Sequence, residues 1–394
     1  MKVRLLLLLL GCSVGQGMVA QQRLPVIHAT STSVTIRDGD QLRKDYWTLT
    51  PSARPDVYEA NRTRRTKRVS FITDLDSISF VLKPGQAHDF VILLNDTDSC
   101  FTRMRSAIMD PGGQVKEPWR SDTIPFTLSA QNNVLVPTVL NSTDTLLMMF
   151  HSAYRGVSVI RGSLDGAKSV HIDGTIVSRA WGGSAEEGFS RENAIGIGNQ
   201  HWDGLEISID ELSGQGSDGK FGYDLFADQV VELNHDRNVM VVHNRTPSGM
   251  KGYVKWPIEY IDGSFFVEGA VTMADRVYPE RFMFHTGYSG QFILGTGFME
   301  RYDLYGKLDT ASVEELKDSF GNTIRNVTIE VQAVRIGKIR SSHVRGSVMD
   351  PSARFEASVL GNGFLKQFNV IIDLRNDVVY ARPRGIVPAP MVAN

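Results

Sequence analysis

The sequence predicts an all-β protein with two related lobes behind an N-terminal β extension. Short runs of β-branched and aromatic residues, such as Val134-Leu135-Val136, recur between Gly, Asn and Asp residues, which is the pattern of strands joined by turns. The chain holds 36 glycines, enough for many tight turns. A segment at 146–156 returns in similar form at 280–290. Such a repeat indicates two copies of one structural unit.

The composition is that of a folded globular protein. Hydrophobic residues make up 42% of the 394 residues and charged residues 22%, which excludes a wholly disordered chain. The 42 Lys and Arg residues nearly balance the 44 Asp and Glu residues, for a net charge of −2. Nucleic-acid binding needs a basic surface, so we expect no nucleic-acid partner. We also expect a monomer. The two cysteines are too few for a disulfide scaffold.

The N-terminus has the form of a secretory signal peptide, which we assign to residues 1–20. Two basic residues precede the leucine run Leu5–Leu10, and small residues follow it. The run is far shorter than the roughly 20 residues that span a bilayer. We therefore expect an exported protein without a transmembrane segment, in the periplasm, the cell envelope or the medium. Cleavage after Ala20 is the favoured processing. The alternative, Leu9-Leu10-Gly11-Cys12, resembles a bacterial lipoprotein box and would acylate Cys12.

Residues 21–125 are assigned to the N-terminal extension, which contains a predicted β-hairpin. Its strands at 78–82 and 89–94 flank the turn sequence Lys83-Pro84-Gly85-Gln86. A basic run lies upstream, at 62–68. This run is either a solvated loop or an exposed processing site for a trypsin-like protease.

Long amphipathic helical patterns are nearly absent from the sequence. The best one is Ser312–Ser319, in which Ser312 and Glu315 have the spacing of a capping box. We therefore expect one short helix there, within a chain that is otherwise rich in strands.

The two copies of the repeat share an apolar run, then Phe-His, a small hydroxyl residue, a small residue, Tyr and, two positions on, Gly. The first copy reads Phe150-His151-Ser152-Ala153-Tyr154-Arg155-Gly156 and the second Phe284-His285-Thr286-Gly287-Tyr288-Ser289-Gly290. Each copy is followed by an apolar-Gly turn, at Gly222 and Gly361, then by a short helix-like stretch and a strand that ends in a polar hairpin. We therefore place lobe 1 at 126–247 and lobe 2 at 248–394, sizes typical of domains.

This arrangement resembles the pepsin/retropepsin-like aspartic proteases. In that family each lobe has an apolar strand that runs into Asp-Thr/Ser-Gly, and later an apolar-apolar-Gly turn that supports the active-site loop. The match to these family segments is good at residues 284–290 and 360–373, and looser at residues 218–224. The segment at 83–103 is similar to exported bacterial members of the group. The resemblance covers about residues 75–382 and implies two pseudo-symmetric β lobes that enclose a cleft.

Both aspartates of the family are replaced here, by His151 in lobe 1 and by His285 in lobe 2. The family's chemistry needs two carboxyl groups that share one proton, so that one acts as base and the other as acid on a water molecule. Neutral imidazole is a base and imidazolium an acid, but a histidine pair lacks the anionic field of the carboxylates. Lobe 1 also has Ser152-Ala153 where the family has Thr-Gly, and we expect Ala153 to weaken the tight turn of that lobe.

Three interpretations of the histidine pair stay open. The favoured one is an inactive dyad in a non-catalytic, peptide-binding relative of the proteases. The second is an active peptidase or hydrolase that uses the histidines directly or with a metal ion. The third is a structural or cell-envelope protein that keeps only the scaffold. We expect no cofactor and no metal, because a zinc site needs three or four ligands. The other histidines are scattered, with His235 and His243 expected on a surface hairpin.

An extended peptide or protein segment is the expected partner, bound in the cleft through main-chain hydrogen bonds. The resemblance places five residues at the cleft beside the histidines, namely Ser152, Tyr154, Thr286, Gly287 and Tyr288. Trp181 and the glycines around it are expected to form a flap. The tyrosines have a simpler explanation in aromatic packing at a strand edge, and the Trp181 segment in a plain hairpin loop.

Overall fold

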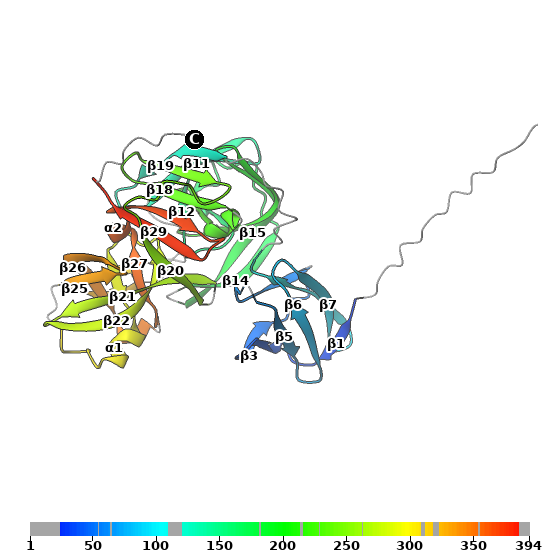
Figure 1. The fold of residues 1–394 in the computed structure, drawn as a ribbon. Coiled ribbons are helices and arrows are strands. Elements are labelled where there is room, and N and C mark those ends of the chain that lie inside the picture. The colour runs from blue at the N-terminus through cyan, green and yellow to red at the C-terminus, as the bar shows by residue number, and fades with distance from the viewer. Residues whose placement is uncertain are drawn as a thin grey trace, which may run out of the picture. The chain divides into compact units, whose positions relative to one another are not determined.

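The computed structural model describes most of the chain (Figure 1). The described residues are 24–53, 55–63, 65–108, 120–180, 183–212, 216–227, 229–261, 263–308, 312–317, 323–353 and 355–385. The chain divides into two compact units, Met1–Ala60 with Arg65–Ser106 as unit 1 and Asn61–Arg64 with Ala107–Asn394 as unit 2. The expected signal peptide with Cys12, and Trp181 of the expected flap, lie outside the described residues.

The described residues of unit 1 form two four-stranded sheets. In spatial order, one contains β1 (Val26–Ala29), β7 (Ala87–Leu94), β8 (Asp98–Ser106) and β4 (Asp56–Ala60), and the other β3 (Gln41–Thr48), β2 (Ser33–Asp38), β5 (Lys67–Ile72) and β6 (Ser77–Leu82). Alternate residues of β1 and β2 are buried, because successive side chains of a strand point to opposite faces. The buried faces share one apolar core that includes Phe71, Phe90 and Cys100.

The two strands predicted at 78–82 and 89–94 exist, but the predicted hairpin is wrong. β6 pairs with β5 in one sheet, whereas β7 pairs with β1 and β8 in the other. The chain therefore changes sheets at the turn between them. The same turn residues suit a hairpin and a connection between two sheets, so the local sequence does not distinguish the two.

The basic run at 62–68 is not a simple solvated loop. Arg62 belongs to unit 2, where its guanidinium lies 4.7 Å from the centroid of the Tyr260 ring and 3.3 Å from a carboxylate oxygen of Asp377. Lys67 opens β5 of unit 1 and forms an ion pair with the buried Asp38. Both ends of the run are thus held by specific contacts. Processing within the run stays a prediction.

The first part of unit 2 forms an eight-stranded sheet, which is lobe 1. Its spatial order is β10 (Thr127–Leu128), β11 (Val134–Leu140), β12 (Asp144–His151), β17 (Gly219–Gly222), β13 (Val157–Ile160), β16 (Gln200–Asp210), β15 (Gly183–Ile197) and β14 (Gly174–Ala180). β11 also pairs with β15, which curls the sheet back on itself. β12 and β17 are parallel, so His151 at the end of β12 lies opposite Gly222 at the end of β17.

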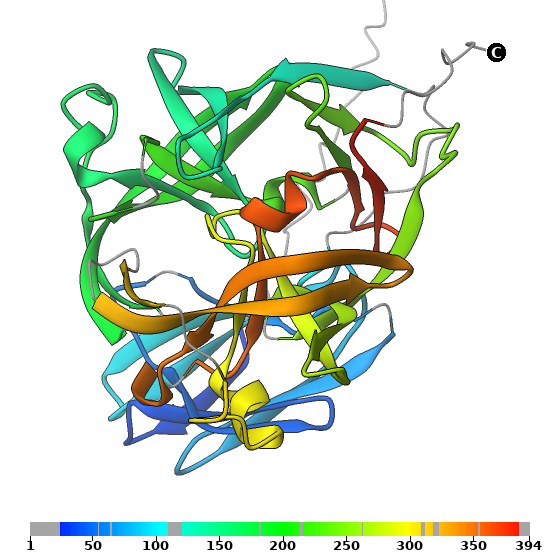
Figure 2. The same ribbon diagram turned by 90° about the vertical axis from the view of Figure 1, so that its left-hand side faces the viewer.

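Lobe 2 belongs to a 13-stranded sheet. Its own strands are, in spatial order, β24 (Ser312–Lys317), β25 (Thr323–Ile336), β26 (Ile339–Met349), β23 (Phe292–Leu294), β27 (Ser358–Gly361), β22 (Arg276–His285) and β21 (Ser264–Met273). Figure 2 shows the long ribbon of β25 and β26 in orange. β22 and β27 are parallel, so His285 lies opposite Gly361.

The other strands of the 13-stranded sheet join the two lobes, and we call this part the linking sheet. Its order is β20 (Val254–Ile261), β29 (Val378–Pro383), β28 (Phe368–Asp373), β18 (Val230–Asn234), β19 (Val239–His243) and β9 (Ser121–Pro125). β18 of lobe 1 pairs with β28 of lobe 2 at its centre. The outermost strands, β9 and β20, each lead into one lobe. The expected boundary at residue 125 therefore differs from the structure, in which unit 1 ends at Ser106 and β9 pairs with β19 of lobe 1.

The two lobes correspond strand for strand. The order β11-β12-β17-β13-β16-β15-β14 of lobe 1 returns as β21-β22-β27-β23-β26-β25-β24 in lobe 2, with the same extra pairing between the first and sixth strands. A short helix follows the Gly turn in both lobes, η2 (Tyr223–Phe226) after Gly222 and α2 (Asn362–Leu365) after Gly361. The predicted all-β fold with two pseudo-symmetric, pepsin-like lobes is confirmed.

Helices are few among the described residues. The α-helices there are α1 (Thr296–Arg301) and α2, with the 3-10 turns η1 (Arg161–Ser163), η2 and η3 (Pro351–Ala353). The predicted helix at Ser312–Ser319 is wrong, because 312–317 form β24, which pairs with β25. A capping-box spacing is a local signal that strand pairing overrides. In the part of the chain that the structure describes, no helix has the length and apolar character needed to cross a membrane.

His235 and His243 lie on a hairpin, as predicted, but they are buried. Their exposed fractions are 1% and 4%. His243 lies at the end of β19, with Nε2 3.1 Å from a carboxylate oxygen of Glu232. His235 follows β18, and its ring packs against Phe126 with 5.3 Å between the ring centroids. The hairpin is part of the linking sheet, where neighbouring strands cover it.

Candidate functional site

Two loops meet between the lobes, at the ends of β12 and β22. Each continues from its histidine with a fully buried hydroxyl residue, Ser152 or Thr286. The N–H of Ser152 donates to Thr286 Oγ1, and the N–H of Thr286 donates to Ser152 Oγ, both at 2.9 Å. Each hydroxyl also donates to the carbonyl of the residue before the opposite histidine, Phe284 (2.7 Å) or Phe150 (2.8 Å). These four bonds, which we call the loop contact, hold the histidines of the two lobes in register.

The loop contact brings the His151 and His285 rings together. Their centroids lie 4.6 Å apart, with the ring planes inclined by 53°. Aromatic rings at such a separation are in van der Waals contact. A water molecule that bridges two groups needs roughly 2.8 Å to a partner on each side. No water therefore fits between the faces of these two rings.

Both histidines are uncharged at neutral pH. His285 is 4% exposed, and burial lowers its pKa from 6.5 to about 4. Burial also holds the pKa of His151 well below its ordinary value, and the neighbouring His285 and Lys220 lower it further. The N–H of Ala153 donates to Nδ1 of His151 at 3.3 Å. The neutral ring of His151 therefore carries its proton on Nε2.

The two loops differ at their third position, which is Gly287 in lobe 2 and Ala153 in lobe 1. The His151 ring lies against Gly287, where a Cβ atom would be 2.3 Å from Cδ2 and 2.4 Å from Nε2 of that ring. Glycine is needed here because the ring approaches the backbone so closely. Ala153 does not adopt a positive φ, and Ser152 makes the full loop contact. The expected weakening of lobe 1 by Ala153 is therefore not supported.

The tyrosines that directly follow Ala153 and Gly287 have different surroundings. Tyr288 is 8% exposed and packs in an apolar cluster with Ile293, Met349 and Val359. Tyr154 is partly buried, and its ring centroid lies 5.9 Å from that of His151 and 4.5 Å from Nζ of Lys220. Aromatic packing thus describes Tyr288. Tyr154 lies close both to His151 and to the buried charge of Lys220.

A buried polar group beside the pair was missed by sequence reasoning. We call it the lobe-1 cluster, and its members are Tyr154, Ser158, Glu187, Asp210 and Lys220. Lys220 on β17 is 3% exposed, and its Nζ lies 2.6 Å from Oδ2 of Asp210 on β16. The same oxygen accepts a hydrogen bond from Ser158 Oγ at 2.8 Å. Burial raises the pKa of Tyr154, with a further contribution from Asp210.

Lobe 2 has apolar residues at the equivalent positions. Lys220 occupies the same register position on β17 as Val359 on β27. Ser158 corresponds in the same way to Ile293, and Asp210 corresponds to Met349. Aligning the two repeats position by position would have revealed Lys220, because the equivalent residue of the other copy is a valine.

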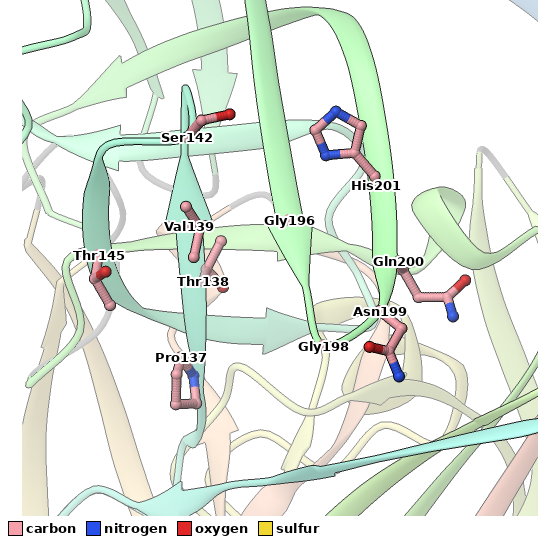
Figure 3. Close-up of a pocket in the computed structure, with 10 residues that line it drawn as sticks. All are labelled: Pro137, Thr138, Val139, Ser142, Thr145, Gly196, Gly198, Asn199, Gln200 and His201. Carbon is pink, nitrogen blue, oxygen red and sulfur yellow. The ribbon is translucent and has the colours of Figure 1, made fainter.

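Two cavities among the described residues lie away from the histidine pair. One, of about 410 Å³, is formed by β11 and the β15–β16 hairpin, where Val139 lies beside Gly196 and the turn carries Gly198 and Asn199 (Figure 3). Another, of about 430 Å³, is lined by residues that include Lys255 and Tyr380. Neither is lined by a residue of the histidine pair or of the loop contact.

A metal site is not evident at the pair. Among the described residues, no group of three or more His, Cys, Asp or Glu side chains is placed to hold a metal ion. The pair offers two imidazoles, and catalytic zinc is held by three protein ligands. The metal-assisted interpretation therefore has no third ligand in the part of the chain that the structure describes.

The sequence matches no protein-family model and no curated protein. Among solved structures, the chain is similar to the crystal structure of an aspartic proteinase from Irpex lacteus, with 11% sequence identity, coverage of 68% of this chain and 98% of that chain, and a TM-score of 0.45. At this level the likeness carries no information on activity. The strand order and the loop contact define a pepsin-like, two-lobed all-β fold with a histidine from each lobe at its centre.

Proposed function

We propose that this protein is an exported, non-catalytic relative of the pepsin-like aspartic proteases, which binds an extended peptide between its lobes. The observation that carries the proposal is the contact of the uncharged His151 and His285 rings at 4.6 Å. Hydrolysis by a carboxyl dyad needs a water molecule beside two groups of which one is ionised. Two neutral imidazoles in contact supply no ionised group.

The intact loop contact supports retained binding. Ser152 and Thr286 keep all four bonds between the loops, although the residues that would perform acid–base catalysis are replaced. Two β lobes joined in this way offer main-chain groups to an extended segment, which is a common mode of peptide recognition. Export is inferred from the basic residues and the leucine run within residues 1–20.

Binding and hydrolysis can be measured side by side. Fluorescence anisotropy with a library of labelled, extended peptides measures binding, and denatured casein from pH 4 to 8, with and without zinc, measures cleavage. We expect binding without cleavage. Cleavage that His151→Ala and His285→Ala abolish would overturn the proposal in favour of an active peptidase. Absence of both activities would leave only the scaffold interpretation.

A gain-of-function variant sharpens this test. His151→Asp combined with His285→Asp restores two carboxyl groups at the loop contact. If peptides lie across the pair, we expect this variant to cleave at acid pH a peptide that the unmodified protein only binds. The matched control is His151→Asn with His285→Asn, which has the same size but no ionisable group. Cleavage by the control as well would point to a contaminating protease.

A further inference from the structure

The tip of the β25–β26 hairpin in lobe 2 is strongly basic. Its two-residue turn is Gly337-Lys338, and the register places Arg335 directly opposite Arg340. Like charges that face each other across two strands destabilise a sheet. Arg335 donates to the carbonyl of Gly337 at 3.1 Å and Arg340 to Ser342 Oγ at 2.7 Å. We call Arg335, Lys338 and Arg340 the basic tip; all three are exposed, and none has an ion pair with another described residue.

The equivalent hairpin tip of lobe 1 has no lysine or arginine. The hairpin β15–β16 holds the same place in the strand order as β25–β26, and it too is closed by a two-residue turn. The three positions of the basic tip are taken there by Gly196, Asn199 and His201 (Figure 3). The fold therefore closes this hairpin without basic residues, and the three charges of lobe 2 call for another explanation.

The two turns pack on equivalent strands of the linking sheet. A Cβ atom at Gly198 would lie 2.6 Å from Ile124 of β9, and one at Gly337 would lie 3.0 Å from Trp256 of β20. β9 and β20 are the outermost strands of the linking sheet, and each pairs with the second strand of a hairpin. The surroundings of the two turns can therefore be compared residue by residue.

The turn of lobe 1 holds a carboxylate. Asp122, two residues before Ile124, accepts hydrogen bonds from the N–H of Asn199 at 2.6 Å and from its Nδ2 at 3.0 Å. The matching residue of β20 is Val254, two residues before the strand's tryptophan. The N–H of Lys338, which corresponds to that of Asn199, has no hydrogen-bond partner among the described residues. Lobe 2 thus has donors and positive charge where lobe 1 has an anion of its own.

One acidic residue lies near the basic tip in the register. Glu268 of β21 comes two residues before Ala270, which lies opposite Arg335. Glu268 itself lies opposite Arg281 of β22 and forms no ion pair with the basic tip. The tip therefore keeps an excess of positive charge.

We propose that the basic tip is an interaction surface that binds the carboxylate groups of an acidic segment of a partner protein. A carboxylate is the group that lobe 1 holds at the equivalent turn, and guanidinium groups bind carboxylates through paired, charge-assisted hydrogen bonds. No residue of the tip belongs to the histidine pair or to the loop contact. The inference is thus independent of the proposed function.

Binding of a short labelled peptide of Asp and Glu, followed by fluorescence anisotropy, tests the proposal. The same peptide with Asn and Gln is the uncharged probe. We expect the acidic peptide alone to bind, and less tightly as NaCl is added. Arg335→Gln combined with Lys338→Gln and Arg340→Gln should weaken its binding about tenfold or more. Unchanged binding in this variant would overturn the proposal.

A second variant places the anion within the chain. Val254→Asp copies Asp122 of lobe 1 and leaves every basic residue in place. We expect it to weaken binding of the acidic peptide by occupying the tip, whereas Val254→Asn, of the same size without the charge, should bind as the unmodified protein does. Binding that survives Val254→Asp unchanged would show that the peptide is held elsewhere and would overturn the proposal.

The control for net charge removes three exposed basic residues of unit 1, by Arg37→Gln, Lys44→Gln and Arg68→Gln. It should leave the affinity for the acidic peptide unchanged, and a loss as large as that of the tip variant would overturn the proposal. Sedimentation with phosphatidylglycerol vesicles tests a membrane as the anionic partner. Binding to these vesicles without binding of the acidic peptide would also overturn it.

Discussion

Lobe 1 and lobe 2 share their strand order, their loop contact and their Gly turns, yet they differ in what they bury beside the histidines. Lobe 2 buries the apolar cluster of Tyr288, Ile293, Met349 and Val359. Lobe 1 buries the ion pair of Lys220 and Asp210 at the equivalent places. One fold therefore accommodates either interior. The difference shows that buried charges at these positions are not needed to shape the sheet.

The same contrast recurs in the linking sheet. His235 follows β18, and Leu374 follows the equivalent strand β28. The turns that come next are closed by equivalent bonds, from Arg237 N–H to Asn234 O and from Asn376 N–H to Asp373 O. Both side chains are about 1% exposed. Lobe 1 thus buries a titratable ring where lobe 2 buries an aliphatic side chain.

The largest effect is expected where a charge of lobe 1 loses its partner. Lys220→Val leaves the buried Asp210 without its cationic partner and should lower the free energy of unfolding by about 4 kcal/mol. Lys220→Val with Asp210→Met copies lobe 2 and should be neutral or stabilising. Urea denaturation measures both variants. A single variant as stable as the double one would show that the two charges are not energetically coupled.

Loss of the loop contact should affect both lobes alike. Ser152→Ala and Thr286→Ala each remove two hydrogen bonds between the loops and leave a buried N–H and a buried C=O without a partner. We expect each to lower the free energy of unfolding by about 3 kcal/mol. Thr286→Ser keeps the hydroxyl and is the control, with a loss of about 1 kcal/mol for one buried methyl group. A much smaller cost for Ser152→Ala would mean that the lobes do not share the contact equally.

Acid should destabilise the protein through its buried histidines. His235 and His285 have a pKa of about 4 when folded, against 6.5 when exposed. Because the folded-state pKa is the lower one, their contribution is complete above pH 6.5 and is lost as the pH falls toward 4, by about 3 kcal/mol for each histidine. His235→Leu gives lobe 1 the residue that lobe 2 has at this position. Unfolding of this variant should take up one proton fewer, so its stability should depend less steeply on pH. Chemical denaturation at pH 8, 6, 5 and 4 measures it, and an equal pH dependence in both proteins would contradict the assignment.

The smallest effect concerns the third position of the loops. Gly287→Ala places a methyl group where the His151 ring lies, so the ring must move, at a cost of about 1–3 kcal/mol. Ala153→Gly makes the reverse change in lobe 1 and should cost about 0.5–1 kcal/mol. Thermal or urea denaturation measures the stability. A Gly287→Ala variant as stable as the unmodified protein would show that the His151 ring does not lie against this residue.

The duplication and its central pair were predictable because both copies keep the Phe-His-hydroxyl sequence and the later Gly turn. The pairing of β6 and β7 with different sheets was not, since the turn at 83–86 suits either connection. The strand at 312–317 was missed because its capping-box spacing is local, whereas its partner β25 decides its structure. The ion pair of Lys220 was missed because Asp210 belongs to another strand, and nothing in the local sequence links them.

The last described strands of the chain, β28 and β29, lie in the middle of the linking sheet, between β18 and β20. The linking sheet therefore cannot form until nearly the whole polypeptide has been synthesised. Until then β18 and β20 each keep one unpaired edge, which is a template for aggregation. Pairing across such long sequence separations is slow. If the chain is exported as we propose, the linking sheet is completed only after its last strands have crossed the membrane.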